Sequence, residues 1–386
     1  MMLGIALKIL VGDRGKYLGV VLGLVFTTFF MTQQPAMFFG VLNRTYGFLS
    51  DAGLVDIWVM DPMVQYVDDV KPLSDTAVAR VRGIEGVGWA VPIYKGNTSV
   101  RLADGNFQNS VLIGLDDATL IGGPAVMVAG SLADLKRADA VIVSQDGAAG
   151  RLARPNPVAG RPPIPLQLGD VIEMNDRRAV VVGICKSTTN TNSQPTLYTT
   201  YSRALTYAPS ARKMLSFVLV KAKGGFEIPT LINNIRHWTG LAAYTREEFE
   251  QKTLLYFLKN SMAITLFGLS ALIGFFIGGL IAGQTFYNFT LENLRYFGVM
   301  KAMGATNRVL LRMIMAQAFA AGAVGYGIGI GLVCILGVTL DARFPFQVSW
   351  ALLLASAAAV IVLCVAASAV SICKVMQLEP ASVFKA

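Results

Sequence analysis

Four stretches of the chain contain no Asp, Glu, Lys, Arg or His, and each is long and apolar. About 20 apolar residues span the hydrocarbon core of a bilayer, and one charge at its centre costs roughly 2.5–3.5 kcal/mol. Helices buried in soluble proteins rarely exceed about 20 residues. The sequence therefore predicts a membrane protein with four transmembrane helices, within the charge-free runs Tyr17–Asn43, Asn260–Leu291, Met313–Leu340 and Phe344–Cys373.

Basic residues gather at one side of these predicted spans. They lie before the first span, between the second and third, and after the fourth: Lys8, Arg14, Lys16, Arg295, Lys301, Arg308, Arg312, Lys374 and Lys385. Because short basic loops stay in the cytoplasm, both termini and the segment 292–312 are predicted to be cytoplasmic. The segment 44–259 is then periplasmic. Large domains cross the membrane largely regardless of their charge, so the net charge of +9 is no argument for a nucleic-acid partner.

The first span is interpreted as a retained anchor. It is longer than the core of a signal peptide, which has about 7–15 residues, and no small-x-small cleavage site follows it. Pro35 is expected to kink or end the helix, because proline lacks a backbone donor. Residues 1–16 are predicted to form an interfacial helix, with a plain extension of the first span as an equal alternative. Residues 374–386 are predicted to be a cytoplasmic tail.

The segment 44–259 predicts an α+β domain inserted between the first and second spans. Strand patterns surround two hairpin signals, Asp104-Gly105 and Asn175-Asp176. Further strands are expected in VDIWVM, SFVLVKA and GLAAYT, and a helix in EIPTLINNIRHWT. Thr245 and Glu248 form a capping-box pattern, and the helix that they open is expected to continue directly into the second span. The proline-rich segment 154–165 and the Thr/Asn-rich segment 186–196 are interpreted as surface loops, with partner contact as the alternative.

Small residues recur four positions apart within the spans. Such spacing lets helix backbones approach closely in lipid. The glycines concerned are Gly19/Gly23, Gly274/Gly278, Gly279/Gly283, Gly325/Gly329 and Gly327/Gly331. Packing inside the bundle is the first interpretation, and a subunit interface is the second.

Signals of catalysis are absent from the sequence. It contains no G-x-x-x-x-G-K-[ST] motif, so we expect no P-loop ATP site, no cofactor in this chain and no enzymatic activity of its own. The single histidine, His237, offers no metal cluster, and Cys185 has no second cysteine within 44–259 for a disulfide. The spans carry no ionisable group, which disfavours an ion-coupled transporter. Energy for any work must come from another subunit.

The cytoplasmic segment 292–312 combines basic residues with an amphipathic pattern. Tyr296, Val299, Met300 and Met303 fall on one helical face, flanked by Arg295 and Lys301. Gly304 is expected to end this helix, and Thr306 can cap the next one. Arg308 is a further candidate residue for contact with the ATPase. Methionines suit a surface that repacks against a moving partner. The segment is therefore interpreted as a docking helix, with a simple basic loop at the headgroups as the alternative.

The stretch LENLRYFGVMKAMGATNRVLLRMI resembles the coupling segment of MacB/FtsX-type ABC permeases, most closely the DevC-type branch. GQTFYNFTLENL and the tail LEPASVFKA are also similar to that branch. The resemblance implies a homodimeric permease in the bacterial inner membrane. It also implies two copies of a separate ATP-binding subunit, which binds ATP and Mg, and a periplasmic adaptor with an outer-membrane channel.

The mechanism implied by the resemblance is mechanotransmission. Cytoplasmic ATP hydrolysis shifts the coupling helices, and the membrane helices carry this motion to the periplasmic domain, where a lipid, glycolipid or other hydrophobic substrate is exported. One alternative is an FtsX-like transmitter that activates a cell-wall hydrolase without transporting anything. Another is a membrane-anchored enzyme or sensor, which would copurify with no ATPase.

Overall fold

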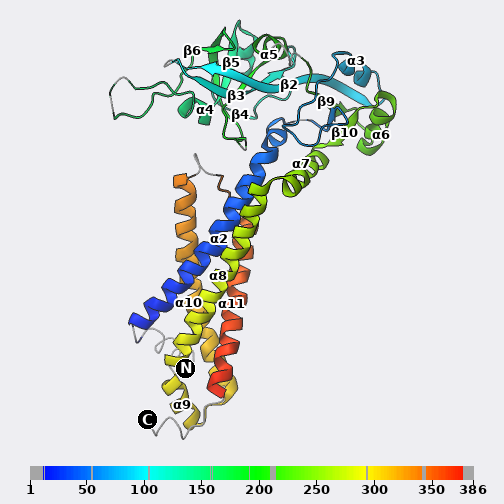
Figure 1. Ribbon diagram of the computed structural model, residues 1–386. Coiled ribbons are helices and arrows are strands. Elements are labelled where there is room, and N and C mark those ends of the chain that lie inside the picture. The colour runs from blue at the N-terminus through cyan, green and yellow to red at the C-terminus, as the bar shows by residue number, and fades with distance from the viewer. Residues whose placement is uncertain are drawn as a thin grey trace. The chain divides into compact units, whose positions relative to one another are not determined.

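The chain forms two compact units in a computed structural model (Figure 1). One unit contains the segments Met1–Val41 and Met262–Ala386, and the other is Leu42–Ser261. We call them the membrane unit and the external unit. The structure describes residues 12, 14–53, 55–102, 105–156, 158, 160–190, 192–208, 214–292, 294–340 and 345–376. The predicted helix at 1–16 and the predicted tail at 374–386 lie almost entirely outside these residues.

The membrane unit is built from long apolar helices. The described helices are α2 (Arg14–Asp51, of which the part up to Val41 belongs here), α8 (Met262–Glu292), α9 (Leu294–Ala302), α10 (Asn307–Leu340) and α11 (Trp350–Met376). Among the described residues, three helices are long and apolar enough to cross a membrane: Tyr17–Asp51, Met262–Thr285 and Asn307–Thr339. The fourth predicted span falls on α11, whose apolar stretch Trp350–Ala366 is shorter. A multi-pass membrane protein is therefore supported, while the count of four stays a prediction.

Glycines of α8 and α10 pack against α2. A Cβ added at Gly274 or Gly278 would lie about 3 Å from side-chain carbons of Gln34 or Met31, respectively. On α10, the same atom at Gly325 or Gly329 would meet Leu24 at 2.5 Å or Thr28 at 2.7 Å. Because these glycines have no side chain, the backbones of α8 and α10 can approach α2 closely. Gly23 faces Thr285 at 2.7 Å, whereas an atom added at Gly19, Gly283, Gly327 or Gly331 meets nothing within 4 Å.

Hydroxyl groups join the helices of this unit. Thr27 donates from Oγ1 to the carbonyl of Gly278 on α8 at 2.9 Å, and Tyr326 on α10 donates to the carbonyl of Leu353 on α11 at 2.7 Å. Buried apolar residues fill the space between α2, α8, α10 and α11: Val20, Leu24, Ala282, Ala318, Ala321, Val360 and Cys364.

The first helix does not end at Pro35. Helix α2 includes this proline and continues to Asp51, beyond the predicted end of the span at residue 43. Proline removes one backbone donor, but helices in membranes tolerate the loss where neighbouring groups replace it. Nearby, the N–H of Gln347 donates to the carbonyl of Ala36 at 3.1 Å. Of the two expected effects of Pro35, a helix end is therefore wrong, and a kink stays a prediction.

The external unit is an α+β domain around a mostly antiparallel sheet. Within the described residues the strands follow the order β10-β1-β9-β2-β3-β8-β5-β7-β4, and β6 pairs with β2 and β7. The strands are β1 (Ile57–Met60), β2 (Val87–Arg101), β3 (Phe107–Leu115), β4 (Val126–Ala129), β5 (Ala140–Ser144), β6 (Val171–Met174), β7 (Arg177–Lys186), β8 (Thr196–Thr200), β9 (Phe217–Ala222) and β10 (Ala242–Thr245). The remaining elements are α3 (Thr76–Arg82), the 3₁₀ helix η1 (Leu132–Lys136), α4 (Gln145–Ala149), α5 (Tyr201–Tyr207), α6 (Ile228–Thr239) and α7 (Arg246–Asn260).

Strand β2 connects the two halves of this unit. Its first part, Val87–Ile93, pairs with β9, and its second part, Tyr94–Arg101, pairs with β3. In Figure 1, α3, α6, β9 and β10 gather around one end of this strand, and β5, β6, α4 and α5 around the other. A long strand shared by two groups of strands gives one continuous sheet with two separate hydrophobic clusters at its ends.

Strand β1 is buried on both faces. Ile57 and Val59 pack into the cluster that contains residues of α3 and α6. Trp58 and Met60 point to the opposite face, because successive strand residues alternate. There the ring of Trp58 lies 5.6 Å from that of Phe48 near the end of α2 and 6.3 Å from that of Phe249 on α7. The end of α2 and the start of α7 are thus anchored on one sheet face.

Both predicted hairpins are present. Strands β2 and β3 pair antiparallel around the first signal, of which Asp104 lies outside the described residues. Strands β6 and β7 pair around Asn175 and Asp176, which have φ values of 48° and 60°. Two successive positive φ angles are typical of a type I′ turn, whose twist matches that of the strands.

The capping box at Thr245 is confirmed. Its side chain accepts from the N–H of Glu248 at 3.1 Å, and Glu248 accepts from the N–H of Thr245 at 3.0 Å. However, α7 ends at Asn260, and Ser261 has φ −100° and ψ 106°, which is extended backbone. The expectation of one helix running from residue 246 into the second span is therefore wrong. In contrast, α2 has residues in both units without a break.

The Thr/Asn-rich loop between β7 and β8 packs on the last turns of α2. Asp51 accepts from the N–H of Thr188 at 2.6 Å and from its hydroxyl at 3.0 Å. Arg44 donates to the hydroxyl of Ser193 at 3.2 Å. Any Cβ at Gly47 would overlap the side chain of Thr188, so glycine is needed for this close approach. The loop thus joins α2 to the half of the sheet that contains β7 and β8.

Candidate functional site: a capped helix between α8 and α10

The short helix α9 lies between two long helices of the membrane unit and packs onto the start of α10. Phe297 is fully buried against Leu310 and Ile314 of α10, with Met300 and Ala305 packed around them. Burying an aromatic side chain contributes roughly 2–3 kcal/mol. This small cluster fixes the orientation of a helix that is too short to be stable alone.

A Schellman motif ends α9. The N–H of Gly304 donates to the carbonyl of Lys301 at 3.1 Å, and the N–H of Ala305 donates to that of Met300 at 3.0 Å. Gly304 has φ +92°, a backbone conformation that residues other than glycine rarely adopt. Met300 and Ala305 both pack against the cluster of Phe297, Leu310 and Ile314, and apolar packing of these two positions usually accompanies the motif. The prediction that Gly304 ends the helix is confirmed, and α10 begins three residues later at Asn307.

The exposed face of α9 differs from the predicted one. Tyr296 and Met303 are 57% and 74% exposed, and Val299 also faces outward. Met300 instead packs inward beside Phe297. The prediction did not include Phe297, whose large ring packs against α10 and so determines which face of α9 is buried. Met300 lies on the same face because it is three positions further along the helix. The inclusion of Met300 in the exposed face is therefore wrong.

Basic side chains adjoin this exposed face. Arg308 and Arg312 are exposed on the first turns of α10, and Lys301 is half-buried on α9. The side chain of Arg295 lies outside the described residues. Glu292 is the one acidic residue in the sequence from 292 to 312. The surface formed by Tyr296, Val299, Met303 and Arg308, which we call the α9 surface, is thus apolar with a positive border.

Among the described residues, the histidine and the acidic side chains were also compared with the requirements of a metal site. His237 is exposed in the last turn of α6, where its ring lies 5.2 Å from that of Trp238. Within the part of the chain that the structure describes, no group of three or more His, Cys, Asp or Glu residues is placed to hold a metal ion.

Comparison with protein families identifies the chain. Residues 17–237 match the family model of the MacB-like periplasmic core domain, and residues 255–380 match that of the FtsX-like permease C-terminal region. The chain belongs to the MacB/FtsX-type permease family. The second match includes α9 and the Schellman motif, so the α9 surface is part of the permease region.

Three solved structures with some similarity are a domain or region of a transporter or permease protein. The extracellular domain of the noncanonic ABC-type transporter YknZ from Gram-positive bacteria is 14% identical, with 50% of this chain and 98% of that chain covered and a TM-score of 0.34. For the periplasmic region of MacB from Actinobacillus actinomycetemcomitans the values are 13%, 54%, 95% and 0.36. For a domain of a putative permease protein from Porphyromonas gingivalis they are 14%, 50%, 90% and 0.33. No curated protein matches the chain.

Family membership defines the general role of the chain. A MacB/FtsX-type permease is an ABC-type transmembrane subunit that works with an ATP-binding subunit and is not itself the ATPase. The DevC-type branch, the homodimer and the identity of further partners remain predictions.

Proposed function

We propose that this chain is the permease subunit of an ATP-driven exporter in the bacterial inner membrane, with both termini in the cytoplasm. Two copies of the chain would work with two copies of an ATP-binding subunit, which binds ATP and Mg. A periplasmic adaptor and an outer-membrane channel would complete the export route. ATP-driven motion would reach the external unit by mechanotransmission, and a lipid, glycolipid or other hydrophobic molecule would be moved on the outer side.

The α9 surface is the observation that carries this proposal. A short helix held by a buried phenylalanine and a Schellman motif leaves Tyr296, Val299 and Met303 exposed to 57%, 36% and 74%. Exposed apolar residues with basic neighbours suit a partner groove that is apolar with acidic edges. Rigid attachment to α10 lets a displacement of α9 act on the long helices instead of being lost in a loose loop.

The continuity of α2 supports the second half of the mechanism. Helix α2 packs against Gly278 and Gly325 in the membrane unit, and its last turns contact Trp58 and Thr188 in the external unit. Because helices resist bending more than extended segments do, α2 is a better candidate for transmitting motion than α7, which is separated from α8 by Ser261.

The experiment is purification of the tagged chain with its ATP-binding subunit from the native membrane. Met303→Asp and Tyr296→Asp are expected to abolish copurification and ATPase stimulation, since each places an unpaired charge in the apolar contact. The matched control is Met63→Asp, because Met63 is 70% exposed in the external unit, and it should leave both properties unchanged. Undiminished stimulation in the two α9 variants would refute the assignment.

The copurifying proteins also distinguish export from signalling. A periplasmic adaptor with an outer-membrane channel supports export. A cell-wall hydrolase in its place would favour the FtsX-like transmitter. Purification with no ATP-binding subunit at all would favour the membrane-anchored enzyme or sensor and contradict both.

A further inference from the structure

The last two turns of α7 expose apolar side chains. Leu255 and Leu258 lie three positions apart, on one face of the helix, and are 53% and 39% exposed. On the opposite face, Phe249 is fully buried in the core of the external unit. The first turn of α7 is different, because it exposes the acidic residues Glu247 and Glu248. The exposed side of the helix is therefore acidic where α7 begins and gains apolar side chains where it ends.

Aromatic rings flank this apolar face. Tyr256 stacks on Tyr66, from the segment that follows β1, with ring centroids 4.4 Å apart. Phe257 meets the same tyrosine edge-on at 5.2 Å. All three rings are partly exposed. Tyrosine is enriched at membrane–water interfaces, because its ring is apolar and its hydroxyl is polar. We call the following residues the α7 patch: Tyr66, Leu255, Tyr256, Phe257 and Leu258.

The length of the chain keeps the α7 patch close to a membrane-spanning helix. Helix α7 ends at Asn260 and α8 begins at Met262, and Met262–Thr285 is long and apolar enough to cross a membrane. At about 1.5 Å per residue, Leu258 lies within about 5 Å of Ser261 along the helix axis and Leu255 within about 9 Å. The polar layer of one leaflet is about 5–7 Å thick. This limit follows from the chain alone, so it holds for every arrangement of the two units.

The start of α8 has the composition of a helix that is already in lipid. Its first exposed side chains include Met262, Leu266 and Leu269, each more than half exposed, and the sequence contains no charged residue between Lys259 and Glu292. If α8 began far above the membrane, water would have to cover these apolar side chains. The 24 residues of the apolar stretch extend over about 36 Å, and the hydrocarbon core is roughly 30 Å thick. The first residue of α8 therefore belongs at the level of the outer headgroups.

We propose that the α7 patch lies in the outer leaflet of the inner membrane, with Leu255 and Leu258 among the headgroups and the first methylene groups of the lipids. An apolar helix face in this layer is removed from water, as in other interfacial helices. Lys259 is exposed in the last turn of α7, where its ammonium group can reach lipid phosphates. The extended backbone of Ser261 lets the chain change direction between α7 and α8, which a helix lying along the headgroups requires.

A lipid surface fits the α7 patch better than a folded partner does. The covalent connection to α8 already brings the patch to the lipid, whereas a protein partner would have to displace headgroups to reach Leu258. The inference needs neither ATP nor the ATP-binding subunit, so it is independent of the proposed function.

The test places the photoreactive residue p-benzoylphenylalanine at Leu255 or at Leu258 of the full chain. The protein is produced in its native membrane, the membranes are irradiated, and the purified chain is digested and examined by mass spectrometry. We expect phospholipid adducts on the α7 peptide with the probe at either position.

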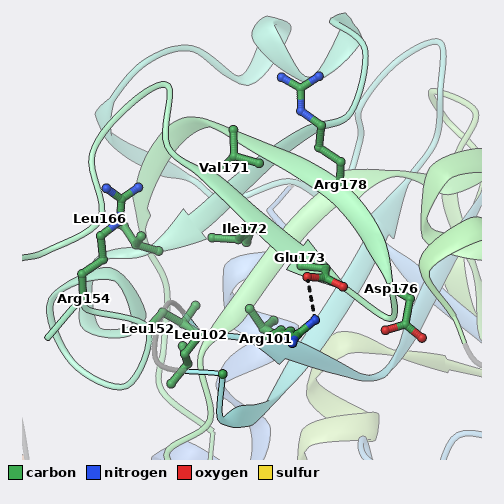
Figure 2. A pocket seen from close by; sticks show the side chains of 12 residues that line it. Arg101, Leu102, Leu152, Arg154, Leu166, Val171, Ile172, Glu173, Asp176 and Arg178 are labelled. Carbon is green, nitrogen blue, oxygen red and sulfur yellow. Dashed lines mark ion pairs between the residues drawn. The ribbon is translucent and has the colours of Figure 1, made fainter.

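Val171 is the matched control for the probe. Its side chain is 51% exposed, close to the value for Leu255. It lies on β6 at a hollow of about 660 Å³ between β2, β6 and β7 (Figure 2), whereas α7 contacts β1 and β10 in the other half of the sheet. The aliphatic side chains that line this hollow offer little apolar surface, because Leu152, Leu166 and Ile172 are 2–8% exposed. We expect no phospholipid adduct with the probe at Val171.

Leu255→Asp tests the contact of the side chain with lipid. An isolated carboxylate is costly in an apolar layer, so phospholipid adducts of the probe at Leu258 should fall several-fold in this variant. Val171→Asp, combined with the same probe, should leave them unchanged. Both substituted positions are on the surface, so the variants are expected to fold, which their melting temperatures check.

Several results would overturn the assignment. They are the absence of phospholipid adducts at Leu255 and Leu258, equally frequent adducts at Val171, and undiminished adducts in Leu255→Asp. Cross-links from the α7 patch to a second copy of the chain or to another protein, in place of lipid, would assign the patch to a protein interface instead. None of these results bears on the docking role of α9, which is measured by ATPase stimulation.

Discussion

At the scale of single residues, Phe297 is the contact that makes α9 a defined surface. Its ring is fully buried between α9 and α10, so Phe297→Ala should cost about 3–5 kcal/mol of local stability. We expect α9 to detach and ATPase stimulation to fall, although the helix keeps its exposed residues. Phe297→Leu, which refills most of the volume, should restore much of the stimulation. Equal activity of the alanine variant and the wild type would show that α9 needs no anchor.

A second residue-scale prediction concerns Cys185 on β7. Burial raises the pKa of this thiol to about 12, and the charge of Asp51 adds to the rise. Because the thiolate is the reactive form, only roughly 1 in 10⁴ molecules would be reactive at pH 8. N-ethylmaleimide should therefore fail to label Cys185 in the native protein at pH 8 and label it readily in urea, as mass spectrometry of the peptide would show. Prompt native labelling would mean that the β4–β7 edge opens.

Local sequence signals gave the residue-scale features that depend on neighbours in the chain. The positive φ of Gly304 and the pairing of Thr245 with Glu248 follow from motifs that are complete within four residues. The inward side chain of Met300 does not, because α10 decides which face of α9 is covered.

At the scale of helices, close packing on α2 explains the glycines of α10. A Cβ at Gly325 would lie 2.5 Å from Leu24, while one at Gly327 would meet nothing within 4 Å. Gly325→Val should therefore destabilise the protein by about 1–3 kcal/mol, the usual cost of overpacking, and Gly327→Val should be nearly neutral. Melting curves of both variants in the same detergent measure the difference. Similar melting temperatures would contradict the packing of α10 on α2.

The contrast between α2 and the α7–α8 joint gives a second prediction at this scale. Two glycines inserted after Val41 interrupt α2, whereas the same insertion after Ser261 lengthens an existing break. The first insertion should abolish any response of the external unit to ATP, and the second should retain most of it. Amide hydrogen exchange of β1 and β9 with and without ATP provides the readout. The reverse result would assign transmission to α7 and α8.

The helix ends show how far sequence reasoning reaches for whole elements. The hairpins, the helix after the capping box and the long apolar helices carry periodic patterns or turn residues, so they were predictable. The helix break at Ser261 was not predictable in this way, because no proline or glycine is present there. Conversely, Pro35 is a residue that often ends helices, yet α2 continues through it. The parallel pairing of β3 with β8 and of β5 with β7 joins distant segments, and no local pattern encodes it.

At the scale of the whole molecule, the chain separates its tasks along the sequence. The region that matches the MacB-like periplasmic core domain contains the described strands β1 to β9, and the region that matches the FtsX-like permease C-terminal model contains α9. Described ionisable side chains are scarce in the membrane helices. This division agrees with the proposal that α9 receives motion from the ATP-binding subunit and that the external unit responds to it.

The most direct test is hydrogen exchange of the external unit in the purified complex, compared between a state bound to a non-hydrolysable ATP analogue and the nucleotide-free state. We predict that exchange in the last turns of α2 and in the β7–β8 loop changes on ATP binding in the wild type and in Met63→Asp. Exchange should not change in the Met303→Asp variant, even when the ATP-binding subunit is added to it at saturating concentration. Identical exchange in both nucleotide states of the wild-type complex would contradict the transmission of motion from α9 to the external unit.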